Sequence, residues 1–407
     1  MNLYSIRREN VSKDLGKNSI IVVYSNDNIK SQDVFNVNKN FYYLTGIDEP
    51  DCALVITNFN NKITSKLLIT PNDPKEAKWT GNRISSNEAS ELSGITNIDS
   101  YLRINDILDS LFDRVRIYSD AIVYLDLWKE QGVLTNAQSL ATRIKKEYPA
   151  VGIDDLYPII TQYRLVKDES EITCITQAIA ITNIGIQSMM KTIKPRMNEM
   201  SLEGLFNFIL FQNKCNKTAF KTICASGPRA TILHYEDNDQ DTKEGDLLLC
   251  DLGATYKNYC ADISRTFPVS GKFSARQKEL YQVVLTAQRI VQDNAVVGND
   301  IKKLTELVVE YYKRELPKHG LKKDVSEYFY HSVSHQLGLD VHDVDGGLGN
   351  ILKAGMVITN EPGLYVAEEG IGIRIEDDLL ITSTGAQCLS SNIAKSPEDI
   401  ELLMRKR

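Results

Sequence analysis

Long apolar runs, a surplus of basic residues and paired cysteines are all missing from this sequence. No stretch approaches the roughly 20 apolar residues that cross a membrane, so a membrane-spanning helix is not expected. The chain carries 47 Lys and Arg against 54 Asp and Glu, a net charge of −7, and such a surface is a poor partner for the phosphates of nucleic acid. Two arginines near the N-terminus have no apolar stretch behind them, which argues against a signal peptide.

Cysteine and histidine are both scarce and scattered. The seven cysteines match neither a CxxC motif nor a disulfide framework, so we expect reduced thiols and a cytoplasmic location. There are five histidines, few enough to weigh one by one. The chain has 407 residues, with no repeat of fixed period and no low-complexity segment. This length exceeds one ordinary core and predicts two domains.

Residues 1–160 have the pattern of an α/β unit. Runs rich in β-branched residues predict strands, and the apolar spacing over 86–115 and 136–149 predicts helices. The second of these helices ends before a proline. The expected strands are 19–25, 52–58, 66–71 and 121–127.

Residues 161–407 form the second predicted domain. Its boundary lies near 161–172, where Asp168 followed three residues later by Glu171 gives a capping box that starts a helix. Helix pairs interleaved with hairpins and irregular strands predict an α+β domain, not a run of βαβ units. Further helices are expected over about 201–216, 274–294 and 299–315.

The segment 245–269 predicts a β-hairpin that turns near Tyr256–Asn258. Asp251 and Asp262 lie eleven residues apart on its two arms. Because their index sum is odd, a connecting loop with an even number of residues puts both carboxylates on one face. They can still be solvated surface aspartates, but each follows a small or apolar residue inside a strand. Like charges placed this way repel, and a bound cation reverses the sign of that energy.

The residues around the histidines make a binding role for some of them more plausible. His331 and His335 are four residues apart and would share one face of a helix. That spacing is compatible with a zinc site, but Ser332 breaks the HExxH motif. A single histidine is more often a packed or surface residue than a ligand. The run HQLGLDVHDVDGG nevertheless concentrates His335 and His342 with acids and glycines, and His234 ends another turn-like segment.

Two glutamates stand at positions that suit binding. Glu361 ends a predicted strand at a Glu-Pro-Gly sequence, where the chain turns sharply. Glu376 lies in a segment that alternates apolar and polar residues, with Arg374 two residues before it on the same face. The pair can be an ordinary surface ion pair, which contributes little. Four carboxylates and one imidazole are, however, what two divalent cations that share oxygen ligands require.

Together these segments resemble one known family. DLGATYKNYCADISRTFP, HSVSHQLGLDVHD, EPGLY and RIEDDLLIT are similar, in this order and spacing, to the metallopeptidases with the pita-bread fold, which include methionine aminopeptidase, prolidase and aminopeptidase P. RRENV, SQDVFNVNKNFYYLTGIDEP and KWTGNR resemble the N-terminal domain of Xaa-Pro aminopeptidases. The resemblance covers nearly the whole chain. It implies a pita-bread catalytic domain over 161–407 (α+β) and a smaller α/β domain of the aminopeptidase P type over 1–160.

The resemblance also implies a dinuclear metal site. Asp251 resembles the chelating aspartate of one metal, and Asp262 the aspartate that bridges both. His335 and Glu361 match ligands of the other metal, and Glu376 matches the second bridge. The residues implied around the substrate are His234 near the scissile bond, His342 as a second active-site histidine, and His331, Tyr365 and Arg374 in the pocket.

The activity implied is release of the first residue from peptides whose second residue is proline. Water shared by two metals has a lowered pKa, and Glu361 is the group expected to take its proton. His234 or His342 is expected to stabilise the oxyanion. The oxygen-rich ligand set favours Mn²⁺ or Co²⁺, and we expect two Mn²⁺ ions, with Zn²⁺ as a further option. The implied partners are Xaa-Pro peptides, and the fold suggests a homodimer or homotetramer.

Two other functions fit parts of the same pattern. A prolidase, which cleaves only Xaa-Pro dipeptides, shares the fold and the metals. A non-catalytic peptide-binding module on the same fold would typically lack metal ligands, whereas all five positions are filled here. Arg374 can contact the substrate or orient Glu376. No role follows from the sequence for Asp33 or Trp79 in the N-terminal domain.

Overall fold

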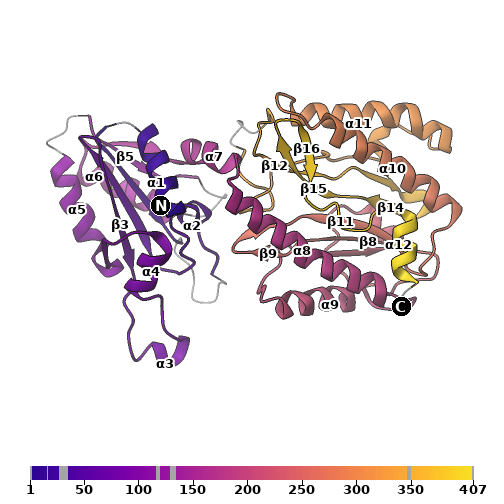
Figure 1. Ribbon diagram of the computed structural model, residues 1–407, viewed down its shortest axis with the longest axis horizontal. Coiled ribbons are helices and arrows are strands. Elements are labelled where there is room, and N and C mark those ends of the chain that lie inside the picture. The colour runs from indigo at the N-terminus through magenta and orange to yellow at the C-terminus, as the bar shows by residue number, and fades with distance from the viewer. Residues whose placement is uncertain are drawn as a thin grey trace. The chain divides into compact units, whose positions relative to one another are not determined.

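The computed structural model describes residues 2–15, 17–26, 35–115, 120–128, 134–345 and 350–405. The chain divides into two compact units, Met1–Arg164 and Leu165–Arg407. Both units combine helices with strands (Figure 1).

The N-terminal unit is built on a six-stranded sheet. Its strands are β1 (Ser19–Tyr24), β2 (Ala53–Phe59), β3 (Lys62–Ile69), β4 (Ile98–Ser100), β5 (Ile122–Leu125) and β6 (Gly152–Asp155). Their order is β4-β3-β2-β1-β5-β6. β1, β2 and β3 pair antiparallel, whereas β4, β5 and β6 join their neighbours in parallel. The four strands predicted here are confirmed, although β3 begins four residues before the expected position 66.

The described residues of this unit also form helices. They are α1 (Leu3–Asp14), α2 (Lys39–Thr45), α3 (Ala77–Thr80), α4 (Ser86–Ser93), α5 (Ile104–Val115), α6 (Asn136–Glu147) and α7 (Tyr157–Leu165), with a 3-10 turn at Tyr101–Arg103. The prediction of one helical stretch over 86–115 is wrong at its centre. Gly94 ends α4 with φ of 72°, a left-handed conformation that glycine adopts readily, and the chain then enters β4.

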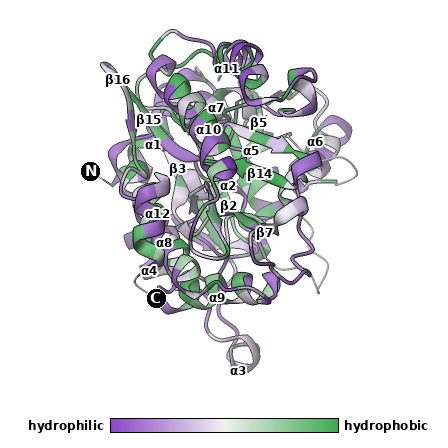
Figure 2. Cartoon of the chain, turned by 90° about the vertical axis from the view of Figure 1, so that its right-hand side faces the viewer, coloured by the Kyte–Doolittle hydropathy of each residue, from purple (hydrophilic) through white to green (hydrophobic). Residues whose placement is uncertain are grey.

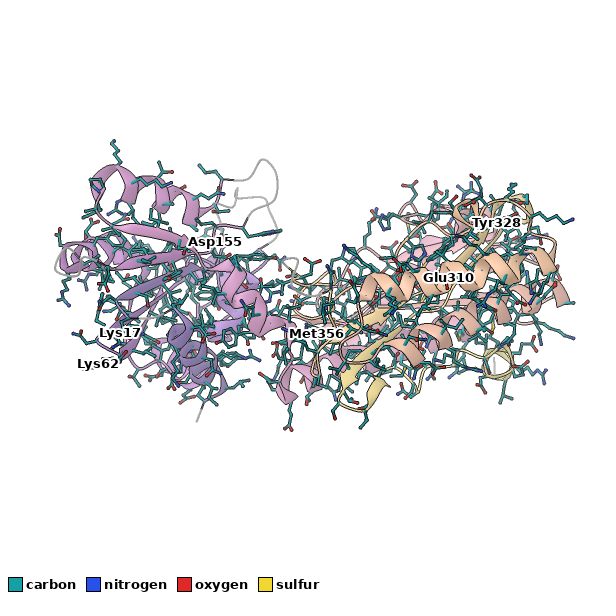
Figure 3. All side chains as sticks on the ribbon, turned by 90° about the horizontal axis from the view of Figure 1, so that it is seen from above. Lys17, Lys62, Asp155, Glu310, Tyr328 and Met356 are labelled. Atoms are coloured by element: carbon teal, nitrogen blue, oxygen red, sulfur yellow. The ribbon has the colours of Figure 1, made fainter. Side chains whose placement is uncertain are left out.

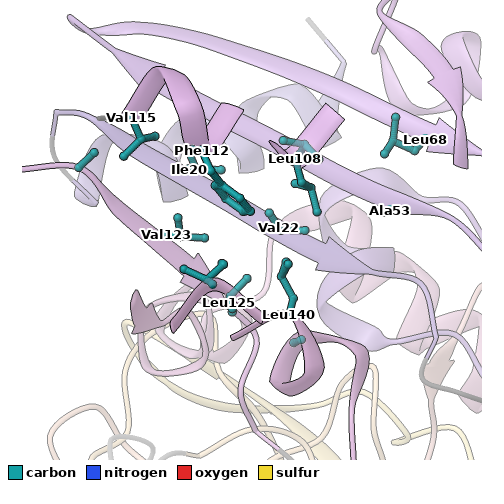
Figure 4. Close-up of a cluster of buried hydrophobic side chains, with 14 residues drawn as sticks. Ile20, Val22, Ala53, Leu68, Leu108, Phe112, Val115, Val123, Leu125 and Leu140 are labelled. Atoms are coloured by element: carbon teal, nitrogen blue, oxygen red, sulfur yellow. The ribbon is translucent and has the colours of Figure 1, made fainter. Parts of the chain in front are cut away.

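One face of the sheet packs against α5 and α6. Leu108 and Phe112 of α5 and Leu140 of α6 meet Ile20 and Val22 of β1 in a fully buried cluster (Figure 4). The strand residues in the cluster alternate along β1, as expected for side chains that point to one face. Outside this core, Trp79 of α3 is 89% exposed. Asp33 lies outside the described residues.

The described residues of the C-terminal unit form two three-stranded sheets and two short ribbons, all antiparallel. Its strands are β7 (Ile223–Ser226), β8 (Leu247–Leu252), β9 (Thr255–Tyr256), β10 (Tyr259–Cys260), β11 (Ile263–Pro268), β12 (Val357–Asn360), β13 (Gly363–Val366), β14 (Ile371–Arg374), β15 (Asp377–Thr382) and β16 (Gly385–Cys388). The sheets have the orders β11-β8-β7 and β12-β15-β16, and the ribbons are β10-β9 and β13-β14.

The described residues of this unit form two helix pairs and one further helix beside these strands. The helices are α8 (Glu169–Thr192), α9 (Glu199–Gln212), α10 (Ala275–Asn294), α11 (Ile301–Glu315) and α12 (Pro397–Met404). α8 and α9 lie on one side of the strands, and α10 and α11 on the other (Figure 1). The predicted capping box is confirmed, since Asp168 caps α8 and Glu171 closes the reciprocal bond. In the described ranges no helix is long and apolar enough to cross a membrane.

The packing of α8 on α9 gives a stability prediction. Both helices carry hydrophilic and hydrophobic residues (Figure 2), and Gly185 of α8 sits against the ring of buried Phe206. A Cβ at Gly185 would lie 2.4 Å from Phe206 Cδ2, so Gly185→Ala should destabilise the unit by roughly 1–3 kcal/mol through overpacking. Gly204 of α9 has nothing within 4 Å of such a Cβ, so Gly204→Ala is the matched control and should stabilise by up to about 1 kcal/mol. Thermal melts of both variants check this; equal shifts would contradict it.

Candidate metal centre

Asp251 and Asp262 are brought together by the hairpin of β8 and β11. Its tip is a two-residue turn at Lys257–Asn258 with φ of 49° and 64°, the signature of a type I′ hairpin. The predicted turn position is therefore confirmed. The register pairs Asp251 with Ser264, which places Asp262 on the diagonal, two residues away and on the same side. Both aspartates line one cavity.

His335 is held beside β12. The backbone N–H of His335 donates to Thr359 Oγ1 at 3.0 Å, and the N–H of Thr359 donates to His335 O at 2.9 Å. The ring Nδ1 lies 3.0 Å from the carbonyl oxygen of Gln336. A carbonyl can only accept, so the proton belongs on Nδ1 and leaves Nε2 free as a ligand atom.

The two glutamates are fixed at strand ends. Glu361 follows β12, and its N–H donates to Val333 O at 2.9 Å, which ties it to the His335 segment. Glu376 lies between β14 and β15, and its N–H donates to Ser264 O at 3.1 Å. Ser264 Oγ in turn donates to Glu376 Oε2 at 2.8 Å. Each glutamate is thus attached to the element that carries another acid or the histidine.

These attachments make the acids and the imidazole converge. Asp262, His335 and Glu376 offer one ligand atom each within 4.8 Å of one another. His335 Nε2 lies 3.5 Å from Asp262 Oδ2 and 3.5 Å from Glu361 Oε1. Asp251 lines the same cavity as these residues. The structure therefore gathers at one cavity all five candidate ligands that the sequence suggested, which come from positions 251 to 376 of the chain.

The crowded negative charges of this cluster would be stabilised by bound cations. Burial raises the pKa of Asp262 well above its usual range, and the neighbouring charges of Asp251, Asp378 and Glu361 raise it further. Burial likewise raises the pKa of Glu376 and of Glu361, and Asp262 adds to the shift of Glu376. Among the described residues, Oδ1 of Asp251 and Oδ1 of Asp262 are buried without a hydrogen-bond partner. Unpaired buried oxygens and crowded acids fit divalent cations, which satisfy both.

A buried arginine organises the back of the site. Arg374 Nη2 donates to Asp251 Oδ2 at 2.6 Å, Nε to Ser264 Oγ at 2.8 Å, and Nη1 to Tyr365 OH at 3.0 Å. Tyr365 OH then lies 2.9 Å from His331 Nε2, while His331 Nδ1 faces its neighbour's carbonyl at 2.7 Å. The bonds therefore run in one direction, from Arg374 through Tyr365 to His331. Of the two roles open for Arg374, this geometry favours orientation of protein groups, with Ser264 as the link to Glu376.

The cavity measures about 1180 Å³. Beyond the four acids and the imidazole of His335, it is lined by His234, His331, His342 and Arg374. Tyr365 differs from the expectation, because it is buried behind His331 and is not among the lining residues. An outer wall is formed by α11, including Thr305, Val309 and Glu310, the last of which Figure 3 labels.

Some residues of the site were missed by reasoning from the sequence. Ser264 connects Glu376 with Arg374, and Thr359 holds His335 and donates to Glu361 Oε1 at 3.3 Å. Asp378 Oδ2 accepts the backbone N–H of Asp262 at 3.3 Å. The sequence held a signal for two of them, since Ser264 and Asp378 each follow a candidate ligand by two positions and so share its side of an extended chain.

Comparisons with known proteins agree with this architecture. The model of metallopeptidase family M24 matches residues 173–383, and that of the aminopeptidase P N-terminal domain matches residues 4–118. The Xaa-Pro aminopeptidase of Escherichia coli is 35% identical over 403 residues, which cover 91% of this chain and 89% of that protein.

Solved structures extend the likeness to the fold. Aminopeptidase P from E. coli with the inhibitor Pro-Leu superimposes with a TM-score of 0.89 at 31% identity, over 100% of this chain and 99% of that one. The zinc-substituted enzyme in complex with product gives 0.89 at 32% identity, over 99% and 98% of the two chains. The pita-bread fold with its additional N-terminal domain is thereby confirmed. This chain belongs to metallopeptidase family M24 and carries the N-terminal domain of aminopeptidase P, so it is a hydrolase of the Xaa-Pro aminopeptidase family.

Proposed function

We propose that the protein releases the N-terminal residue from peptides that have proline in second position, with water activated at a two-metal site. The observation that carries the proposal is the convergence of four carboxylates and one imidazole on the wall of a single cavity that also presents three further histidines. The relatives named Xaa-Pro aminopeptidase support the substrate class. The neighbour with Pro-Leu bound supports a place for proline directly after the scissile bond.

Asp251, Asp262, His335, Glu361 and Glu376 would hold the metals. Their donors are mostly carboxylate oxygens, which suit Mn²⁺, and the zinc-substituted neighbour shows that a related site also accepts Zn²⁺. When bound, two such cations supply a water of lowered pKa and polarise the scissile carbonyl. The protein supplies the remaining chemistry.

Glu361 is the proposed proton acceptor. Its carboxylate lies within reach of His335 and receives the hydroxyl of Thr359 on Oε1. Burial raises the pKa of Glu361, which makes it a stronger base than a solvated glutamate. Its Oε2 faces His331 Nδ1 at 3.7 Å, so one carboxylate spans the ligand cluster and the substrate side of the cavity.

The histidines would stabilise charge on the substrate. Burial, with His335 nearby, lowers the pKa of His342, and burial with Arg374 lowers that of His331 to about 4. Both rings are therefore neutral at pH 7. A neutral imidazole donates one N–H without bringing a charge that would repel cations. We propose that His342 and His234 donate to the developing oxyanion.

Proline would be selected by shape. An Xaa-Pro bond has no N–H to recognise, so His331, held by Tyr365, forms a rigid wall for the ring. The cavity continues along α11 for a volume far larger than a dipeptide needs. This observation favours an aminopeptidase over a prolidase.

A short peptide panel tests the function. With Mn²⁺ added, the purified protein should release Arg from Arg-Pro-Pro and cleave peptides of three to five residues, and chelation should abolish this activity. Cleavage of Gly-Pro with Arg-Pro-Pro left intact would show a prolidase instead. A metal content well below one ion per chain after reconstitution with Mn²⁺ would indicate a non-catalytic module.

A further inference from the structure

We propose that Glu199 is a positioning residue for His234: its buried carboxylate anchors Tyr235 and so fixes the turn from which His234 faces the cavity. The inference rests on the proposed function, in which His234 contacts the substrate. Glu199 lies outside the cavity and would act only through the chain that it holds.

The carboxylate of Glu199 accepts four hydrogen bonds, from Ser226, Tyr235 and Gln240. The Tyr235 hydroxyl also lies 3.0 Å from Asp239 Oδ1, farther than from Glu199. Glu199 is the first residue of α9 and is fully buried. Its Oε1 accepts the N–H of Ser226 at 2.8 Å and the hydroxyl of Ser226 at 2.6 Å. Its Oε2 accepts Tyr235 OH at 2.8 Å and the N–H of Gln240 at 3.1 Å. A carboxylate at a helix N-terminus is further stabilised by the helix dipole, so the anchor is strong.

The four groups that donate to Glu199 all belong to one stretch of chain, from Ser226 to Gln240. Ser226 ends β7, Gln240 lies fourteen residues later, and Tyr235 lies between them. Asn238 adds a second attachment to β7, because its Oδ1 accepts the N–H of Cys224 at 2.8 Å and its Nδ2 donates to Thr222 O at 2.8 Å. The stretch from Ser226 to Gln240 is therefore pinned at both ends and near its middle.

His234 depends on this framework for its place. In the described part of the chain it has no side-chain hydrogen bond, and its ring is exposed on the cavity wall. The next residue, Tyr235, is 6% exposed and belongs to a buried cluster that also contains Ile223, Leu249 and Tyr365. Because the His234 ring has no hydrogen bond among the described residues, its position depends on the backbone. The hydrogen bond from Tyr235 to Glu199 fixes that backbone.

A purely structural role for Glu199 is the competing explanation, and a double-mutant cycle separates the two. Tyr235→Phe removes the hydroxyl and keeps the apolar packing. It should lower kcat/KM on Arg-Pro-Pro about 10-fold, a typical effect of a residue that orients another. In the His234→Ala background the same change should lower kcat/KM less than about 2-fold, because nothing remains to be oriented. Glu199→Gln should behave like Tyr235→Phe in both backgrounds.

Equal losses in the two backgrounds, or no loss in the wild-type background, would overturn the proposal. The matched control is Glu401→Gln. Glu401 is also buried (5% exposed) and accepts a backbone N–H, that of Phe273 at 3.1 Å. It lies on α12, and no residue of α12 lines the cavity. Its replacement should change thermal stability but leave kcat/KM as it is.

A measurement on the His234 ring that does not depend on catalysis separates the test of the positioning role from the test of the proposed function. The chain has five histidines, so their ring proton signals can be assigned in ¹³C-histidine-labelled, Zn²⁺-loaded protein by single substitutions. Tyr235→Phe should shift or broaden the His234 signal and leave that of His319 unchanged. An unmoved His234 signal refutes the positioning role even if the enzyme is active. Failure of the wild-type protein to cleave any Xaa-Pro peptide refutes the proposed function alone.

Discussion

An Asp262→Asn variant is expected to lose metal and activity while its metal-free form keeps or gains stability. Asp262 stands nearest the centre of the cluster, with Oδ2 at 3.5 Å from His335 Nε2 and Oδ1 buried without a partner. An amide has nearly the same shape but offers one neutral oxygen. Activity should fall by more than about 100-fold, the upper range for residues that only support a ligand. The Mn²⁺ content should fall with it.

The gain in stability follows from the charges that are removed. Burial and then Asp251 raise the pKa of Asp262 in the metal-free fold, so the folded state holds a proton that the unfolded state releases. The metal-free wild type should therefore lose stability as the pH rises above the ordinary carboxylate range of about 4. The variant should lose less over the same window. Calorimetry with and without a chelator at several pH values measures both.

Asp293→Asn provides the control for this variant. Asp293 is exposed on α10 and does not line the cavity, so its replacement should leave metal content, activity and melting temperature as in the wild type. An Asp262→Asn protein that still binds two ions and turns over within a few-fold of the wild type would contradict the assignment of Asp262 as a ligand.

Among the substitutions proposed for this protein, Asp377→Ala is expected to reduce the free energy of unfolding the most. Asp377 is buried and accepts from Arg265 Nη2 at 2.7 Å, Lys395 Nζ at 2.6 Å, Ser390 Oγ at 2.7 Å and Gln288 Nε2 at 3.0 Å. The guanidinium of Arg265 is fully buried. Truncation would leave it without its counter-ion, and breaking a buried pair in this way typically costs about 3–5 kcal/mol.

Arg276→Ala is the comparison for Asp377→Ala. Arg276 pairs with Glu369 at 2.6 Å, but both side chains are about a third exposed, at 32% and 31%, and such pairs contribute about 0–1 kcal/mol. Urea unfolding of the two variants should differ severalfold in the free energy lost. Similar losses would mean that Arg265 finds other acceptors, such as the carbonyl oxygens of Ser264 and Ala394 that it already contacts.

Strand periodicity predicted part of the site well. The parity of Asp251 and Asp262 placed them on one side of a hairpin, and the turn at Lys257–Asn258 agrees with that prediction. Periodicity cannot tell which side of a strand is buried when the neighbours are unknown. Tyr365 therefore seemed suited to the pocket surface, whereas β13 turns it inward to join Arg374 and His331.

Contacts between residues far apart in the sequence could not be predicted from local sequence patterns. Glu199 and Tyr235 lie 36 positions apart and belong to different elements, and no local spacing relates them. In the N-terminal unit, β4 is three residues long, which is too short for an alternation of apolar and polar residues to be recognised. Its strand conformation depends on parallel pairing with β3. The family resemblance supplied the candidate metal ligands as a set, whereas the residues that hold them by hydrogen bonds were found only in the structure.

The dispersal of the ligands has a consequence for biosynthesis. Asp251 lies in β8, in the hairpin of the β11-β8-β7 sheet, whereas Glu376 lies just before β15 near the end of the chain. A growing polypeptide folds from its N-terminal side, and an unfolded chain offers no preformed metal site. The N-terminal unit can thus be complete on the ribosome while the centre cannot yet exist. A metal site that includes Glu376 can form only after that residue has left the ribosome. Metal loading would then be a late step in the synthesis of this enzyme, and a chain that stalls before Glu376 would be released without metal.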